Sequence, residues 1–316
     1  MRYVRYILCI VGIVMAAPSR WAAAGPVDPN HLPALAAWYL HIDMEAARKT
    51  TLFKEIREEI NTKVPLEDTL AQIRATLGFD PLADIKGITL YGTSFTQGVG
   101  ALLIYGKLDQ GGVQTMIAGN PGYAQGTHGK HIVHTWADKG KQPACSFYNP
   151  ELIVLGDSKE TVTAALDVLD GKTRGGSTLV KQQPPGVIAC AAAAGLRNVG
   201  DEGLSRLLAA SEEAMLSIAE IEGKTRATLA ITFRTPEIAT QMGKLAEGLR
   251  ALLILNAQKG PVAADVASQI TTSVEGTRVS ATFECESTKL LGQLKALQEE
   301  HQRNKQAAAA TPAPRR

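Results

Sequence analysis

The hydrophobic pattern at the start of the first half predicts a strand followed by two helices. Residues 36–42 form a short apolar and aromatic run typical of a strand, and Asp43 follows it at a position from which its side chain can cap a helix. Apolar residues then recur every three or four positions from Leu52 to Ile60 and again from Leu66 to Leu77, which predicts two amphipathic helices. Gly78 stands where the second helix must end.

The rest of the first half favours strands joined by short turns. A hairpin is predicted where residues 85–95 and 99–107 are separated by Thr96, Gln97 and Gly98. The other elements that we predict are a short helix over 108–118, a glycine-rich loop over 119–129, strands over 130–137, 144–149 and 152–155, and a helix over 159–169.

The second half repeats this order of elements. We predict a strand over 187–194, a helix over 201–213, a hairpin of 215–221 with 225–233, a helix from Thr235 to Asn256, a hairpin of 269–274 with 277–284, and a final helix from Ser287. Thr235 and the proline after it are a strong helix start. Strand 225–233 alternates, with one face formed by Ala227, Leu229, Ile231 and Phe233 and the other by Arg226, Thr228 and Thr232.

This order of elements predicts the fold class and the organisation of the chain. Strands joined by short turns, with a helix after each hairpin, predict an α+β fold of antiparallel sheets covered by helices, in two similar halves with repeated strand-hairpin-helix units. The predicted segments are a signal peptide over 1–24, a first half over 25–171, a linker over 172–186, a second half over 187–305 and a disordered tail over 306–316.

The segment 1–24 has the layout of a secretory signal peptide. Arg2 and Arg5 precede an uninterrupted apolar run from Tyr6 to Ala17, and small residues precede a cleavage position after Ala24. A helix of that length rises about 18 Å, which is short of a hydrocarbon core of about 30 Å. We therefore expect cleavage, export to the periplasm or cell envelope, and no transmembrane segment afterwards; retention of the leader as an anchor is the alternative.

The charge of the chain limits its partners. It has 33 basic and 31 acidic residues, and the segment 1–24 holds three arginines and no acidic residue. The remainder has 30 basic and 31 acidic residues, a net charge of −1. A body so close to neutrality gives no reason to expect a nucleic acid or an anionic membrane as partner, so we expect a protein or another envelope component.

Three cysteines follow the leader, namely Cys145, Cys190 and Cys285, and none belongs to a Cys-x-x-Cys motif. The number is odd, so at least one is unpaired within the chain, while an oxidising compartment allows one disulfide. Three small buried apolar side chains are the alternative. The sequence leaves open whether any two are bonded.

His128, His131 and His134 are the densest group of residues of a metal-binding type. On a strand, an offset of three places His131 and His134 on opposite faces, which favours separate strand histidines over a zinc or copper site. We therefore predict no metal and no other cofactor, and keep these three histidines as the candidates for a metal site.

No motif of a catalytic site is present. The chain lacks a Gly-x-Ser-x-Gly elbow and a glycine-rich phosphate loop, and Ser158 is explained as a helix cap. His41 and Asp43 stand two apart, which permits a pair on one side of a strand, although Asp43 is explained more simply as a cap. We predict no catalytic residue; the alternative is a hydrolase assembled from distant residues, with His41, Asp43 or the 128–134 strand as its parts.

Two stretches carry a resemblance to a known group. One is Leu32 and Pro33 followed by residues 36–43, and the other is residues 78–85 leading into residues 88–92. Together they resemble exported bacterial proteins of unknown function that are common in planctomycete-type bacteria, over the leader and the first half of the chain. The resemblance implies an envelope location and transfers no site residue. With the missing motifs, it favours a non-catalytic binding or scaffolding protein of the periplasm or cell envelope.

Overall fold

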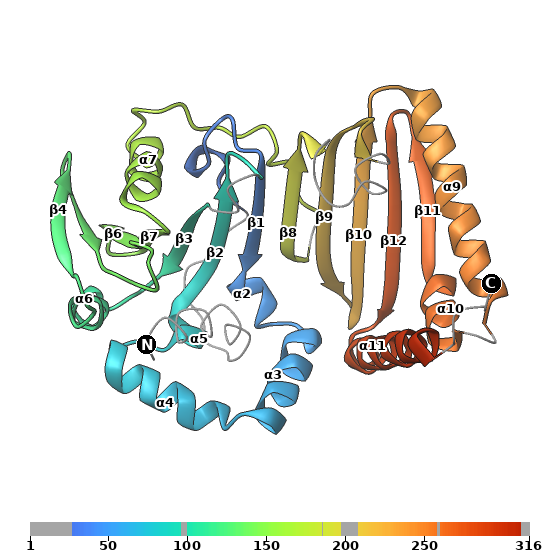
Figure 1. Cartoon of the computed structure of the whole chain (residues 1–316), viewed down its shortest axis with the longest axis horizontal. Coiled ribbons are helices and arrows are strands. Elements are labelled where there is room, and N and C mark those ends of the chain that lie inside the picture. The colour runs from blue at the N-terminus through green and yellow to red at the C-terminus, as the bar shows by residue number, and fades with distance from the viewer. Residues whose placement is uncertain (1–26, 96–99, 185, 197–207, 258–259, 311–316) are drawn as a thin grey trace.

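The computed structural model describes residues 27–95, 100–184, 186–196, 208–257 and 260–310. Over these residues the chain has the predicted α+β fold, in the form of one antiparallel sheet of twelve strands with helices on both of its sides (Figure 1). The strands are β1 (Trp38–Asp43), β2 (Ile85–Gly92), β3 (Ala101–Gly106), β4 (Ala124–His128), β5 (His131–Thr135), β6 (Ala144–Asn149), β7 (Leu152–Gly156), β8 (Val187–Ala194), β9 (Ser211–Ile221), β10 (Lys224–Phe233), β11 (Ile270–Glu275) and β12 (Arg278–Glu286). The helices are η1 (Pro29–His31), α2 (Met44–Ala47), α3 (Thr51–Lys63), α4 (Leu66–Leu77), α5 (Pro81–Asp84), α6 (Gln110–Ala118), α7 (Lys159–Leu169), α9 (Pro236–Leu255), α10 (Pro261–Ser268) and α11 (Ser287–Ala310).

The two predicted halves share this sheet rather than forming one each. The strand order is β11-β12-β10-β9-β8-β1-β2-β3-β7-β6-β5-β4. β1 pairs with β2 on one edge and with β8, the first strand of the second half, on the other, so that Leu40 stands between Leu90 and Ala191. The backbone ladder therefore continues across the boundary. Repeated units are not confirmed, because β4 to β7 form a group of four strands before α7 that has no counterpart among the described elements of the second half.

Side chains alternate between the two sides of the sheet, which we name after their helices. The α7 side bears Tyr39 and Thr228, and the α9 side bears Leu40 and Leu229. The alternation predicted for strand 225–233 is confirmed by its register with β9 and β12. Figure 1 shows α7 over one part of the sheet, and α3, α4 and α11 along one rim of it.

Each side has its own core. On the α7 side, Leu166 and its neighbours on α7 pack against Tyr39 and Leu103. On the α9 side, helices α2 to α5 pack on the first half around Met44 and Leu82, and α9 packs on Phe233 through Ala239. The helices α9 and α11, which contact β10 and β12, both approach from the α9 side. Among the described helices, α9 and α11 therefore leave the α7 side of β9 to β12 uncovered.

Local capping signals are confirmed where a polar residue precedes a predicted helix. Asp43 accepts a hydrogen bond from the Ala46 backbone N–H at 2.8 Å, and it begins α2. Ser158 and Thr235 accept in the same way at the starts of α7 and α9. Gly78 ends α4 with φ of 74°, a left-handed conformation that favours glycine.

Three predicted segments differ from the structure. The predicted loop over 119–129 contains β4, because residues of weak strand propensity are held there by pairing with β5. Residues 211–213 of the predicted helix over 201–213 begin β9, where pairing with β8 and β10 overrides local preference. α10 was not predicted, and α11 continues through 306–310, where the tail was expected to begin. The predicted leader, the turn over 96–98, residues 201–207 and residues 311–316 lie outside the described part.

Among the helices that the structure describes, none combines the length and the apolar character that a membrane crossing demands.

Candidate functional site

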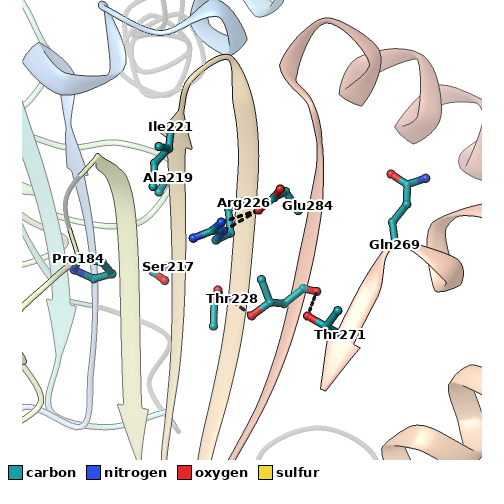
Figure 2. Close-up of a pocket in the computed structure, with 10 residues that line it drawn as sticks. Pro184, Ser217, Ala219, Ile221, Arg226, Thr228, Gln269, Thr271 and Glu284 are labelled. Atoms are coloured by element: carbon teal, nitrogen blue, oxygen red, sulfur yellow. Dashed lines mark hydrogen bonds and ion pairs between the residues drawn. The ribbon is translucent and has the colours of Figure 1, made fainter. Parts of the chain in front are cut away.

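The α7 side of the second half carries a hollow of about 480 Å³ that crosses β9, β10, β12 and β11 (Figure 2). Sites for small molecules commonly measure about 300–1,000 Å³. The hollow is lined by Pro184, Ser217, Ala219, Ile221, Arg226, Thr228, Gln269, Thr271, Thr282 and Glu284. We call it the hydroxyl hollow, because four of these residues bring side-chain hydroxyl groups to it.

The four hydroxyl residues form a row across the strands. Register places Ser217 opposite Thr228, Thr228 opposite Thr282, and Thr282 opposite Thr271. The Thr228 and Thr282 hydroxyls are 3.1 Å apart, and the Thr271 hydroxyl donates to the Thr282 carbonyl at 3.4 Å (Figure 2). Ser217 makes no side-chain hydrogen bond to a described residue, so much of the hydrogen-bonding capacity of the row is unused.

An ion pair stands beside this row. Arg226 donates from Nε and Nη2 to one carboxylate oxygen of Glu284, at 2.8 and 2.6 Å, and Lys224 lies 3.7 Å from the other oxygen. These contacts hold the pKa of Glu284 below its usual value. Arg226 and Glu284 are the charged residues of the described lining, and Lys224 stands just outside it. Among the described residues of the lining, none is a histidine that could act as a base for Ser217.

The opposite side of the same strands presents apolar side chains to solvent. Leu229 stands opposite Leu216, and Ala191 connects Leu216 to Leu40 across β8. The leucines of this row, Leu40, Leu216 and Leu229, are exposed by 40%, 40% and 44%. A packed sheet face would bury such residues, so this row is a candidate contact surface.

α9 adds leucines on the same side of the sheet. Its inward residues are Ala239 and Gly243, and a Cβ at Gly243 would lie 2.3 Å from Val274 Cγ2, so glycine permits the close approach of α9 to β11. Leu245, Leu249 and Leu252, spaced four and three apart, are exposed by 42%, 53% and 56%. Such spacing forms one stripe along a helix. We call the row Leu40, Leu216 and Leu229 and the stripe Leu245, Leu249 and Leu252 together the leucine surface.

The structure does not bring the three candidate metal histidines together. His131 Nε2 lies 3.1 Å from both carboxylate oxygens of Asp170, and His128 Nε2 lies 2.8 Å from Asp167. His134 projects to the other side of the sheet and contacts the Tyr123 hydroxyl at 3.0 Å. The offset of three therefore separates His131 from His134 as expected. Within the described ranges, no group of three His, Cys, Asp or Glu side chains has the arrangement of a metal site.

His41 and Asp43, two of the residues named for a hydrolase, do not contact each other. His41 is buried, and its Nδ1 lies 2.8 Å from the Thr89 hydroxyl. Burial lowers the pKa of His41 to about 4, which keeps the ring neutral at ordinary pH. Its Nε2 has no hydrogen-bond partner among the described residues. Asp43 caps α2 instead of contacting this ring.

The three cysteines are free thiols and are buried. Burial raises the pKa of Cys145 to about 12 and raises those of Cys190 and Cys285 above their usual value. A thiol held in its neutral form is a poor nucleophile and metal ligand. Burial of all three thiols agrees with the alternative in which Cys145, Cys190 and Cys285 act as small apolar residues.

Sequence reasoning missed both candidate surfaces. The alternation in 225–233 predicted which side Thr228 faces, but not that Thr282 and Thr271 stand beside it, because these are contacts between strands far apart in the chain. The exposure of Leu229 was missed for a related reason, since the apolar face of a strand is expected to be covered. The sequence did contain a pattern that predicts the exposed stripe, because Leu245, Leu249 and Leu252 recur every three or four positions in a helix already rich in leucine.

Comparison with known proteins leaves the family open. No family model and no curated protein matches the chain. Among solved structures, crystal form III of TP0453, a Treponema protein, is 13% identical with a TM-score of 0.46, over 86% of this chain and 99% of that chain. Crystal form IV of TP0453 is 12% identical with a TM-score of 0.47, over 86% of this chain and 97% of that chain. Similarity of this degree supports no argument about function.

Proposed function

We propose that this chain is an exported, non-catalytic binding protein of the periplasm or cell envelope, and that it holds a protein partner on its leucine surface. The observation that supports the proposal is the exposure of leucines in two ordered sets on one side of the sheet. Scattered exposed leucines are normal, whereas ordered sets of them mark contact surfaces. Two of the residues named for the hydrolase alternative, His41 and Asp43, have structural partners instead of each other.

The partner that fits the stripe is an amphipathic helix. Leu245, Leu249 and Leu252 follow the spacing by which helices pack against one another through apolar side chains. Full burial of one leucine side chain contributes about 1.5–3 kcal/mol. Two such residues account for a change in affinity of well over ten-fold when both are lost, since ten-fold corresponds to about 1.4 kcal/mol.

The double substitution L245Q/L249Q is expected to reduce capture of the partner at least about ten-fold. In the assay, Gly248, where an added Cβ meets nothing within 4 Å, is replaced by a photocrosslinking amino acid, and the protein is irradiated in envelope extract. The crosslinked bands are then quantified for the two backgrounds. Glutamine retains good helix propensity, so α9 is expected to stay folded, and circular dichroism checks this.

The matched control is Lys244→Gln, which changes an exposed residue of the same helix for which no partner is found among the described residues. It is expected to leave the crosslinked bands unchanged. Bands of equal intensity from L245Q/L249Q and from the unmodified stripe would refute the proposed role of the leucine surface. Crosslinks from one copy of the chain to another would show that the leucine surface binds a second copy of this chain and not a separate partner.

The export part of the proposal has its own test. Expressed with its leader in a Gram-negative host, the chain is expected to accumulate in the periplasmic or envelope fraction and to begin at Gly25, by mass spectrometry of its N-terminal peptide. Replacement of Arg2 and Arg5 by glutamate should reduce export, since it removes the positive region of the leader. An uncleaved chain that begins at Met1 in the cytosolic fraction would contradict export.

A further inference from the structure

We propose that the hydroxyl hollow binds a neutral ligand rich in hydroxyl groups, in the form of a short linear saccharide. The hollow lies on the opposite side of the sheet from the leucine surface, since Thr228 and Leu229 are neighbours on β10 that point to opposite sides. A saccharide site here is therefore independent of the proposed protein partner, and each is tested without the other.

The spacing of the hydroxyl row fits a ligand that lies across the strands. Ser217, Thr228, Thr282 and Thr271 are register partners on four neighbouring strands. Neighbouring strands lie about 4.8 Å apart, so the row offers hydroxyl groups at regular intervals over about 14 Å. A linear saccharide that crosses the strands presents hydroxyl groups on each of its rings, and it can meet this row at several points at once.

The hydrogen bonds that the row can form match those of a sugar. Each hydroxyl can donate once and accept twice, so the row both donates and accepts. Ser217 uses none of this capacity toward a described residue, and the Thr228 and Thr282 hydroxyls share a single contact. Sugar hydroxyls have the same dual character, whereas a carboxylate or phosphate chiefly accepts and an ammonium group donates. The unused capacity therefore matches a saccharide better than it matches an ion.

The charged groups beside the row disfavour an ionic ligand. An anion site needs a basic group with no carboxylate on it, but two nitrogens of Arg226 contact Glu284, and Lys224 lies 3.7 Å from the same carboxylate. A cation would be repelled by Arg226 and Lys224 beside this carboxylate. The remaining N–H groups of Arg226 can still donate to neutral oxygens at the edge of the hollow. These paired charges leave donors for a neutral ligand.

The shape of the hollow is consistent with a small ligand held weakly. Its volume is about 480 Å³, and Pro184, Ala219 and Ile221 provide an apolar wall that the C–H faces of a sugar ring can contact. The lining, as far as the chain is described, contains no aromatic ring, so the stacking that strengthens many saccharide sites is missing. We therefore expect affinity in the millimolar range and fast exchange.

The experiment is an NMR titration of the full mature chain labelled on threonine methyl groups. Maltotriose, cellotriose and the trimer of N-acetylglucosamine are added in separate titrations. A further titration with sodium sulfate tests whether the hollow binds an anion. At least one trisaccharide is expected to shift the Thr228 and Thr282 methyl signals in a saturable way. Thr228→Val and Thr282→Val, which replace the hydroxyl by a methyl group of similar size, are each expected to weaken that binding at least about ten-fold.

The matched control is Thr232→Val, on the same strand and the same side but outside the lining. It should retain the affinity, and circular dichroism on all three variants reports whether the sheet is intact. The proposal is overturned if no trisaccharide shifts these signals, if Thr228→Val and Thr282→Val bind as the unmodified protein does, or if sulfate saturates the site instead.

Discussion

Replacement of Glu220 by alanine is expected to lower the free energy of unfolding by about 3 kcal/mol at neutral pH. Glu220 lies on β9 in the second half, and its carboxylate oxygens accept from the backbone N–H groups of Thr51 and Leu52 at 2.7 and 2.8 Å, in the first turn of α3. Hydrogen bonds to a charged group contribute about 1.5–3 kcal/mol each, and alanine leaves both donors without this partner. Urea unfolding followed by circular dichroism measures the loss.

The same contact gives the effect a pH dependence. Burial disfavours the charge of Glu220, but the N–H groups of Leu52 and Thr51 outweigh it, so its pKa lies below its usual value. A carboxylate of lowered pKa stabilises the fold above its unfolded pKa of about 4.3, and this contribution is lost as the pH falls through the lower folded value. The difference between the unmodified chain and E220A is therefore expected to be full at neutral pH and to narrow below about pH 4.

Two further variants distinguish the loss of the hydrogen bonds from Glu220 to α3 from a general effect of removing a negative charge. Glu220→Gln keeps one acceptor oxygen and should lose less stability than alanine. Glu212→Ala removes a carboxylate from the same strand at an exposed position and should have little effect. Equal losses for E220A and E212A would show that the contact between β9 and α3 does not stabilise the fold.

Glu220 also shows where prediction from the sequence ends. The caps at Asp43, Ser158 and Thr235 were predictable because the side chain and the N–H group that it binds are within three residues. Glu220 and Thr51 are separated by 169 positions, and no local pattern in the chain relates them. Thr50 caps α3 locally, whereas the contact from Glu220 can be recognised only once the sheet places β9 beside the first half.

The same distinction applies to the sheet and to the candidate surfaces. Alternation assigned the two faces of β10 correctly, because the period of two is a property of the strand itself. The pairing of β1 with β8 was not predictable, since it joins segments on either side of the linker and depends on which edges remain free. The hydroxyl row and the leucine row are both products of strand order, so they were missed together.

Replacement of Asp170 by alanine is expected to cost about 2 kcal/mol of unfolding free energy. Its carboxylate, at the end of α7, lies 3.1 Å from His131 Nε2 on β5, and the two side chains are exposed by 8% and 3%. Lys130 and Lys172 contact the same carboxylate at 3.1 and 3.4 Å. Alanine leaves the His131 ring buried without its partner, and the cost of such a group is about 1–3 kcal/mol.

The charged groups around Asp170 set the direction of its pH effect. Burial disfavours the charge of Asp170, but His131 and Lys130 outweigh it and bring its pKa to about 2. The stabilisation is present above the unfolded pKa of about 3.9, and it is lost as the pH falls through the folded value of about 2. The gap between the unmodified protein and D170A is expected to persist at mildly acidic pH and to close only in strong acid.

The variant Asp167→Ala shows how much of the effect of D170A on stability depends on burial of the His131–Asp170 contact. Asp167 contacts His128 and Lys172 in the same manner, but its side chain is exposed by 27% and that of His128 by 30%. Water can replace the lost partner there, so its loss of stability should be much smaller than that of D170A. Equal losses would mean that burial of the contact between His131 and Asp170 adds nothing to the free energy of unfolding.

His131 lies on β5, far along the sheet from β9 to β12. D170A should therefore bind a trisaccharide as the unmodified chain does, under conditions in which it remains folded. Unchanged binding would show that the contact between His131 and Asp170 stabilises the fold and does not contribute to the hydroxyl hollow.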